Sequence, residues 1–120
     1  MKTLLSPKFT AMALQDVAAI QDWTSTKFGE LTSLRYDRLM EAALADLLAE
    51  PTRLGVRHHP AMPQGIFVYH LRFSRKKPTR AGVEKPRHFF VFRVDEDILT
   101  VLRVLHDSMD LAAHVESPAP

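Results

Sequence analysis

Hydrophobic residues recur every three or four positions through the first quarter of the chain. The residues that share this spacing are Phe9, Ala13, Val17, Ile20, Thr24 and Phe28. The spacing places them on one face of a helix. Ser6 and Pro7 are typical of a helix start, as N-cap and first helical residue, and Gly29 is typical of a helix end. Residues 3–5, before this helix, predict a short strand.

A second helical pattern covers residues 31–50 and stops at Pro51, which cannot continue a helix. Its hydrophobic surface is wide and comprises Tyr36, Leu39, Met40, Ala43, Leu44, Leu47 and Leu48. The link between the two helices is very short, so we expect them to lie antiparallel as a helical hairpin.

After the second helix, the hydrophobic period changes from helical to alternating. Residues 51–65 are rich in proline and glycine and predict a loop. Residues 66–75, 88–94 and 98–106 predict three strands joined by local turns. The expected fold class is therefore α+β. A short N-terminal strand and a helical hairpin pack on a three- to four-stranded antiparallel sheet, and a short helix follows at residues 109–115.

The composition is that of a small globular protein. The chain has 120 residues, of which 46% are hydrophobic and 25% charged, so we expect a single domain over residues 1–116 and a disordered tail at 117–120. The absence of cysteine excludes disulfides and thiolate chemistry and favours a reducing, cytoplasmic setting. No hydrophobic run is long enough for a signal sequence or a membrane span.

Charge is distributed unevenly, although the net charge is only +2. Residues 51–93 contain ten Lys and Arg and a single acidic residue, Glu84, whereas the segments on either side are acidic. Such a basic block predicts an anionic partner, either nucleic acid or an acidic protein surface, or else a solvated hairpin loop. The cations that we expect to face a target are Arg72, Arg75, Lys76, Lys77, Arg80, Arg87, Arg93 and Arg103.

The histidines do not predict a metal site. His58 and His59 are adjacent, and neighbouring side chains of an extended chain point in opposite directions. No histidine or carboxylate accompanies them at a spacing typical of metal ligands. The four glycines do not cluster into a phosphate-binding loop. We therefore expect no metal and no cofactor.

Three stretches, in their order along the chain, resemble the RelE/ParE superfamily of bacterial toxins. They are F-G-E at residues 28–30, E-P-T-R-L-G at residues 50–55 and R-V-L-H-D-S-M-D-L at residues 103–111. The resemblance extends over residues 4–115 and is closest to the ParE-like branch. It implies a toxin of a type II toxin–antitoxin system, which a cognate antitoxin neutralises.

The resemblance leaves two targets open. It implies that a RelE-like member cuts messenger RNA on the ribosome, whereas a ParE-like member poisons DNA gyrase without nuclease chemistry. Cleavage of RNA without a metal requires general acid–base groups and cations around the phosphate. If the chain is such a nuclease, the candidate catalytic residues are Arg72, Arg87, Arg103 and His106.

The sequence departs from the nuclease pattern after His106. Asp107 comes next, and its carboxylate would repel a phosphate. We therefore rank gyrase poisoning above messenger-RNA cleavage and expect no catalytic residue. His106 then ties the strand end to the following turn through its ring nitrogens. A non-catalytic nucleic-acid-binding or interaction protein is the third hypothesis.

The same resemblance implies an antitoxin that folds as it binds the toxin surface. The hydrophobic surface of the second helix contains more large residues than one buried side needs. The candidate antitoxin contacts are Leu34, Leu39, Met40 and Leu48. The alternative is that these residues pack against the sheet.

Overall fold

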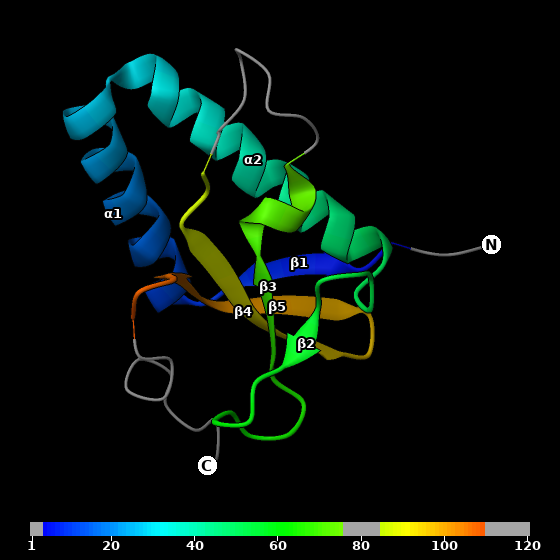
Figure 1. Cartoon of the computed structure of the whole chain (residues 1–120). Helices are drawn as coiled ribbons and strands as arrows, with labels where there is room; N and C mark the ends of the chain where they lie inside the picture. The colour runs from blue at the N-terminus through cyan, green and yellow to red at the C-terminus, as the bar shows by residue number, and fades with distance from the viewer. Residues whose placement is uncertain (1–3, 76–84, 110–120) are drawn as a thin grey trace.

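A computed structural model describes residues 4–75 and 85–109, and it confirms an α+β fold in which two helices cover one face of a sheet (Figure 1). The elements in chain order are β1 (Ser6–Phe9), α1 (Ala11–Phe28), α2 (Glu30–Ala49), β2 (Arg57–His58), β3 (Phe67–His70), the 3-10 helix η1 (Leu71–Ser74), β4 (His88–Asp95) and β5 (Ile98–His106). The strands lie in the order β1-β5-β4-β3-β2. The predicted sheet is wrong in two details, because the described residues form five strands and β1 runs parallel to β5.

The structure confirms the helical hairpin predicted from the sequence. Helix α2 begins and ends within one residue of the predicted 31–50. Gly29 joins α1 to α2 with a φ of +91°, a conformation that favours glycine. Its N–H donates to the Ser25 carbonyl at 3.0 Å, which ends α1 as expected.

The start of the first helix differs from the prediction. Ser6 and Pro7 belong to β1, because pairing with β5 outweighs the local helix signal; the Ser6 N–H donates to the Asp97 carbonyl at 2.7 Å. Helix α1 begins at Ala11, with Thr10 as its N-cap. The short strand predicted at residues 3–5 is not found at Leu4 and Leu5, and residue 3 lies outside the described residues.

The outer edge of β1 is poorly suited to another strand. The N–H groups of Ser6 and Thr10 point to β5, where they donate to backbone carbonyls, so the alternate N–H groups face outward. Of these, the Leu5 N–H donates to the Leu48 carbonyl at 3.1 Å, and Pro7 has none. A partner chain therefore finds few free donors at this edge.

The strand predicted at residues 66–75 is also shorter than expected. Strand β3 ends at His70, and the predicted remainder to Arg75 turns into η1. The Arg72 N–H donates to His70 Nδ1 at 3.1 Å, which stabilises this turn. The loop predicted at residues 51–65 contains the short strand β2. The predicted helix at 109–115 and the tail at 117–120 lie outside the described residues, except for Met109.

Buried side chains form two clusters, one on each face of the sheet. The larger lies under the helices and comprises Ala13, Ile20, Tyr36, Leu39, Met40, Ala43, Leu47, Tyr69, Leu71, Phe90, Phe92, Leu99, Val101 and Val104. The smaller, on the opposite face, comprises Met62, Ile66, Val68, Val91 and Leu105. Strand β4 contributes to both clusters because its side chains alternate between the faces. Neither described helix is long and hydrophobic enough to cross a membrane.

Candidate functional site: a charged cluster beside a cleft

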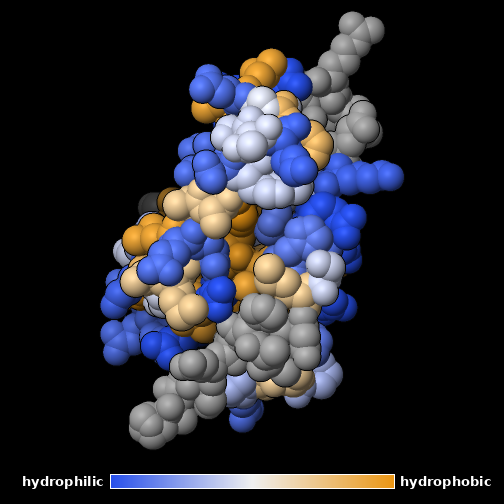
Figure 2. Space-filling model, turned by 90° about the vertical axis from the view of Figure 1, so that its left-hand side faces the viewer, coloured by the Kyte–Doolittle hydropathy of each residue, from blue (hydrophilic) through white to orange (hydrophobic). Residues whose placement is uncertain are grey.

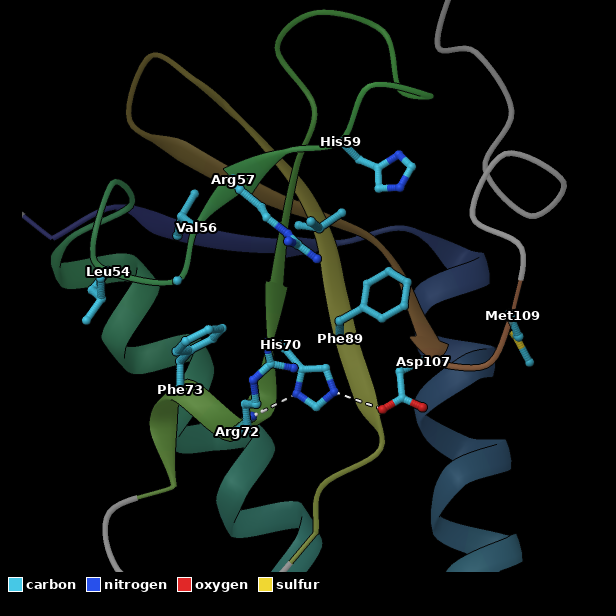
Figure 3. A pocket seen from close by; sticks show the side chains of 12 residues that line it. Leu54, Val56, Arg57, His59, His70, Arg72, Phe73, Phe89, Asp107 and Met109 are labelled. Carbon is cyan, nitrogen blue, oxygen red and sulfur yellow. Dashed lines mark hydrogen bonds and ion pairs between the residues drawn. The ribbon is translucent and has the colours of Figure 1, made fainter.

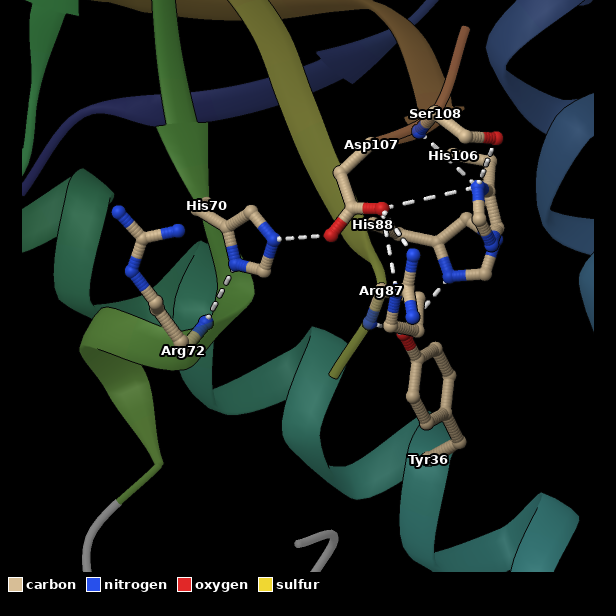
Figure 4. A network of polar contacts seen from close by, with 8 residues as sticks. All are labelled: Tyr36, His70, Arg72, Arg87, His88, His106, Asp107 and Ser108. Carbon is tan, nitrogen blue, oxygen red and sulfur yellow. Dashed lines mark hydrogen bonds and ion pairs between the residues drawn. The ribbon is translucent and has the colours of Figure 1, made fainter. Parts of the chain in front are cut away.

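Strand ends bring titratable side chains together at one end of the sheet (Figure 4). His70 ends β3, His88 begins β4 and His106 ends β5. The antiparallel register aligns His88 with His106, and their ring centroids lie 5.2 Å apart, edge to face. Together with Arg87 and Asp107, these histidines form what we call the terminal cluster.

Asp107 lies at the centre of the terminal cluster. Its Oδ2 lies 3.1 Å from His70 Nε2, and its Oδ1 lies 3.1 Å from both Nε and Nη2 of Arg87. Partial burial acts to raise the pKa of Asp107, but the hydrogen bonds from His70 and Arg87 outweigh it and lower the pKa. The carboxylate is therefore charged at neutral pH and neutralises Arg87.

Two of the histidines are held by backbone groups. His70 Nδ1 accepts the Arg72 N–H, and His106 Nδ1 accepts the Ser108 N–H, each at 3.1 Å. A ring nitrogen that accepts a backbone N–H carries no proton, so His70 donates to Asp107 through Nε2. Burial lowers the pKa of His70 although Asp107 acts in the opposite direction. His106 Nδ1 also lies 2.7 Å from Ser108 Oγ, so the residue ties the strand end to the next turn.

The third histidine connects the cluster to α2. Tyr36 Oη accepts the Arg87 N–H at 3.0 Å and lies 2.7 Å from His88 Nδ1. Burial lowers the pKa of His88 to about 4 and raises the pKa of Tyr36 to about 12. The hydroxyl therefore keeps its proton at neutral pH and shares a hydrogen bond with a neutral imidazole. The sequence does not predict a site role for either residue, since no local pattern joins positions 52 residues apart.

A cleft opens beside the terminal cluster on the helix-free face of the sheet (Figure 3). We call it the sheet cleft; its volume is about 710 Å³, and it is lined by Leu54, Gly55, Val56, Arg57, His59, Val68, His70, Arg72, Phe73, Phe89, Asp107 and Met109. The Arg57 side chain extends across the cleft toward Phe89. Cations therefore surround a hydrophobic surface, and one carboxylate lies at the end nearest the terminal cluster.

The structure brings together three of the four residues named as nuclease candidates. Arg72, Arg87 and His106 lie in or beside the terminal cluster (Figure 4). Arg103 lies elsewhere on β5, where its Nε and Nη2 donate to the two carboxylate oxygens of Asp16 at 2.8 and 3.0 Å. Both side chains are only 16% exposed, so Arg103 holds α1 against the sheet.

The remaining predicted target-binding cations are dispersed. Arg75 follows η1 and is half-buried. Arg93 lies within 3.0 Å of Asp95 near the turn between β4 and β5. Lys76, Lys77 and Arg80 lie outside the described residues. Of the five predicted target-binding cations that the structure describes, Arg87 belongs to the terminal cluster and Arg72 lies beside it.

The predicted antitoxin contacts also differ in how far they are buried. Leu39 and Met40 are buried in the larger cluster, and Leu48 packs against it. Leu34 is 53% exposed on α2. Met40 also lines a smaller groove between the helices, together with Phe9, Leu14, Val17, Gln21, Asp37, Glu41, Leu44 and Phe90. Figure 2 shows hydrophobic side chains gathered in a hollow on the side of the molecule where α1 lies.

Hydrogen bonds within the terminal cluster limit its ability to bind a metal ion or to act in catalysis. Within residues 4–75 and 85–109, no three histidine or acidic side chains are placed to hold a metal ion. The Asp107 carboxylate and the Nδ1 atoms of all three histidines already have hydrogen-bond partners in the protein. This arrangement stabilises the strand ends and presents cations to the cleft.

Comparisons with known proteins agree with this architecture. Residues 8–111 match the family model described as the ParE toxin of the type II toxin–antitoxin system parDE. The chain is similar in fold to a structure of the chromosomal ParDE system of P. aeruginosa, with 18% identity, a TM-score of 0.64 and coverage of 86% of this chain and 96% of that one. It is also similar to the RelBE2 toxin–antitoxin complex of Mycobacterium tuberculosis, with 18% identity, a TM-score of 0.53 and coverage of 87% and 99%. No curated protein sequence matches the chain. The match over residues 8–111 means that the chain belongs to the ParE family of type II toxin–antitoxin toxins.

Proposed function

We propose that this toxin poisons DNA gyrase in the cytoplasm and that a cognate antitoxin neutralises it. Family membership supports both the toxin class and the antitoxin, since the similar structures are of toxin–antitoxin systems. The observation that carries the choice of target is the position of Asp107. Its carboxylate occupies the centre of the cations and histidines that a nuclease would use to hold a phosphate.

The charge of Asp107 opposes RNA cleavage at this place. Two like unit charges about 4 Å apart in a partly exposed site repel by up to about 4 kcal/mol. A phosphate that approached Arg87 or His70 would meet this repulsion and would compete for donors already bonded to the carboxylate. Catalysis by cationic stabilisation requires donors that are free to meet the developing charge.

Cleavage of messenger RNA on the ribosome is the alternative, and one observation favours it. Three histidines and Arg87 gather at one end of a cleft, with Arg72 beside them. Under this alternative, His106 is the acid–base candidate, and displacement of Asp107 would have to accompany RNA binding. A non-catalytic nucleic-acid-binding protein would share the cations and lack both activities.

Gyrase assays with the purified toxin test the proposal. We expect inhibition of DNA supercoiling, or trapped double-strand breaks, and the same result with His106→Ala. Ribosomes carrying a defined message provide the second assay, in which we expect no cleavage. Cleavage that His106→Ala abolishes, with gyrase unaffected, would establish the alternative. Growth arrest on expression separates either toxin from an inert binding protein.

A further inference from the structure

We propose that the sheet cleft binds an acidic and hydrophobic peptide segment of the antitoxin, with Arg57 and Arg72 pairing with its carboxylates. This inference rests on the proposed function, because it takes the antitoxin as the partner. It places the contact on the helix-free face of the sheet, away from the α2 residues that the sequence indicated.

Two arginines of the cleft differ from four other arginines of the protein. Arg53, Arg87, Arg93 and Arg103 each pair with a carboxylate of the protein. Arg57 and Arg72 are exposed, and neither forms an ion pair with any residue that the structure describes. The Arg72 guanidinium lies 4.7 Å from the centroid of the Phe73 ring, which orients it without neutralising it. Both therefore remain available to an anionic partner.

The hydrophobic side chains of the cleft indicate what kind of partner carries the anionic groups. Leu54 is 87% exposed, and Phe73 and Met109 are each exposed by more than a third. Val68 on β3 and Phe89 on β4 line the same cleft. A group of large exposed hydrophobic side chains beside cations is typical of a protein-binding surface. The occupant is therefore expected to supply hydrophobic side chains as well as carboxylates.

The charge pattern favours a peptide over a nucleic acid. A nucleic acid carries a negative charge at every phosphate, and part of its backbone would approach Asp107 at the end of the cleft. A peptide can place its carboxylates at Arg57 and Arg72 and a neutral side chain near Asp107. Because Pro7 limits strand addition at the β1 edge, a face of the sheet is the better place for an extended segment.

A paired charge reversal tests the cleft. We would measure the affinity of the purified toxin for the antitoxin encoded beside it by calorimetry, using wild type and the double variant Arg57→Glu, Arg72→Glu. We expect affinity to fall roughly 10- to 100-fold, and the loss to shrink at high salt. The control Lys27→Glu, Arg38→Glu makes the same charge change on the helical hairpin, where both residues are exposed, and should alter affinity by less than about 3-fold.

A second variant tests the hydrophobic part without risk to the fold. Leu54→Asp changes a side chain that is already 87% exposed, and we expect it to weaken binding roughly 10-fold. Circular dichroism should show native helix content for every variant.

The outcomes separate the inference from the proposed function. If wild type fails to bind the antitoxin, the proposed partner is wrong, and the inference falls with it. If wild type binds and both cleft variants bind equally tightly, the inference is wrong, while the toxin–antitoxin pairing stands. If wild type shifts a single-stranded RNA oligonucleotide and the arginine variant does not, while antitoxin affinity is unchanged, the cleft is a nucleic-acid site, and the inference is overturned.

Discussion

Acid should weaken the fold through His88, which is neutral and partly buried in the native state. Burial is the largest cause of its lowered pKa, the neighbouring His106 acts in the same direction, and Asp107 opposes both. His70 and Arg87 also lower the pKa of His88. The folded protein therefore resists protonation of this ring, whereas the unfolded chain accepts a proton near pH 6.5.

The size of the effect follows from linkage. A pKa of about 4 in the folded protein against 6.5 in the unfolded chain means that the stabilising contribution is fully present above pH 6.5. It is lost as the pH falls from 6.5 toward 4. Between pH 7 and pH 5 the free energy of unfolding should fall by about 2 kcal/mol on this account. Partial solvent screening reduces the expected loss to about 1–2 kcal/mol.

The variant His88→Asn isolates this contribution, since a side-chain amide near the position of Nδ1 can donate to or accept from the Tyr36 hydroxyl but does not titrate. Urea unfolding followed by circular dichroism at pH 7 and pH 5 gives the free energy of unfolding for wild type and variant. Wild type should lose about 1–2 kcal/mol more than the variant over this interval. His58→Asn, at an exposed position on β2, controls for removal of a histidine outside the cluster. Equal losses in wild type and His88→Asn would refute the reasoning.

Three further substitutions test single contacts by the same urea assay. Asp16→Asn removes the charge that pairs with Arg103 and should cost about 2–3 kcal/mol, with the midpoint shifted and the m-value unchanged. Tyr36→Phe leaves one backbone N–H and one imidazole nitrogen without their partner and should cost about 1–3 kcal/mol; an unchanged midpoint would count against that network. Gly55→Ala should cost about 1–3 kcal/mol, because φ is +101° and the added Cβ would lie 2.5 Å from the Phe73 ring. In a Phe73→Ala background the cost should fall, leaving only the backbone strain.

The elements that sequence predicted best are those that local spacing determines. Helix α2, the Gly29 link and strand β5 follow from residues that are neighbours in the chain. The sequence predicts a helix start where β1 lies, because the strand that pairs with β1 begins at Ile98, about 90 residues away. A Ser-Pro pair fits both structures locally, and only the tertiary pairing decides between them.

At the candidate functional site too, contacts between residues distant in the chain could not be predicted from sequence. Sequence located the cations and His106, because charge and residue type are visible in one dimension. It did not reveal that Asp16, 87 residues from Arg103, already binds that guanidinium, or that Tyr36 reaches His88. Asp107 is the exception. Its position directly after His106 indicated repulsion of phosphate, and the structure shows the same carboxylate bonded to His70 and Arg87.

Among its described residues, the basic block therefore contains arginines that pair with a carboxylate of the protein and arginines that form no ion pair with another described residue; the second kind suits an anionic partner. Arg87 is bonded to Asp107 within the fold, so a ligand that engaged it would have to break an existing ion pair and leave a carboxylate unpaired. Arg57 and Arg72 carry no such cost, since their charges face solvent beside a hydrophobic surface. If the antitoxin binds the sheet cleft as proposed, partner recognition and the stability of the strand ends depend on different residues. Under the proposed binding, charge reversal at Arg57 and Arg72 should weaken antitoxin binding while the terminal cluster, and with it the fold, stays intact.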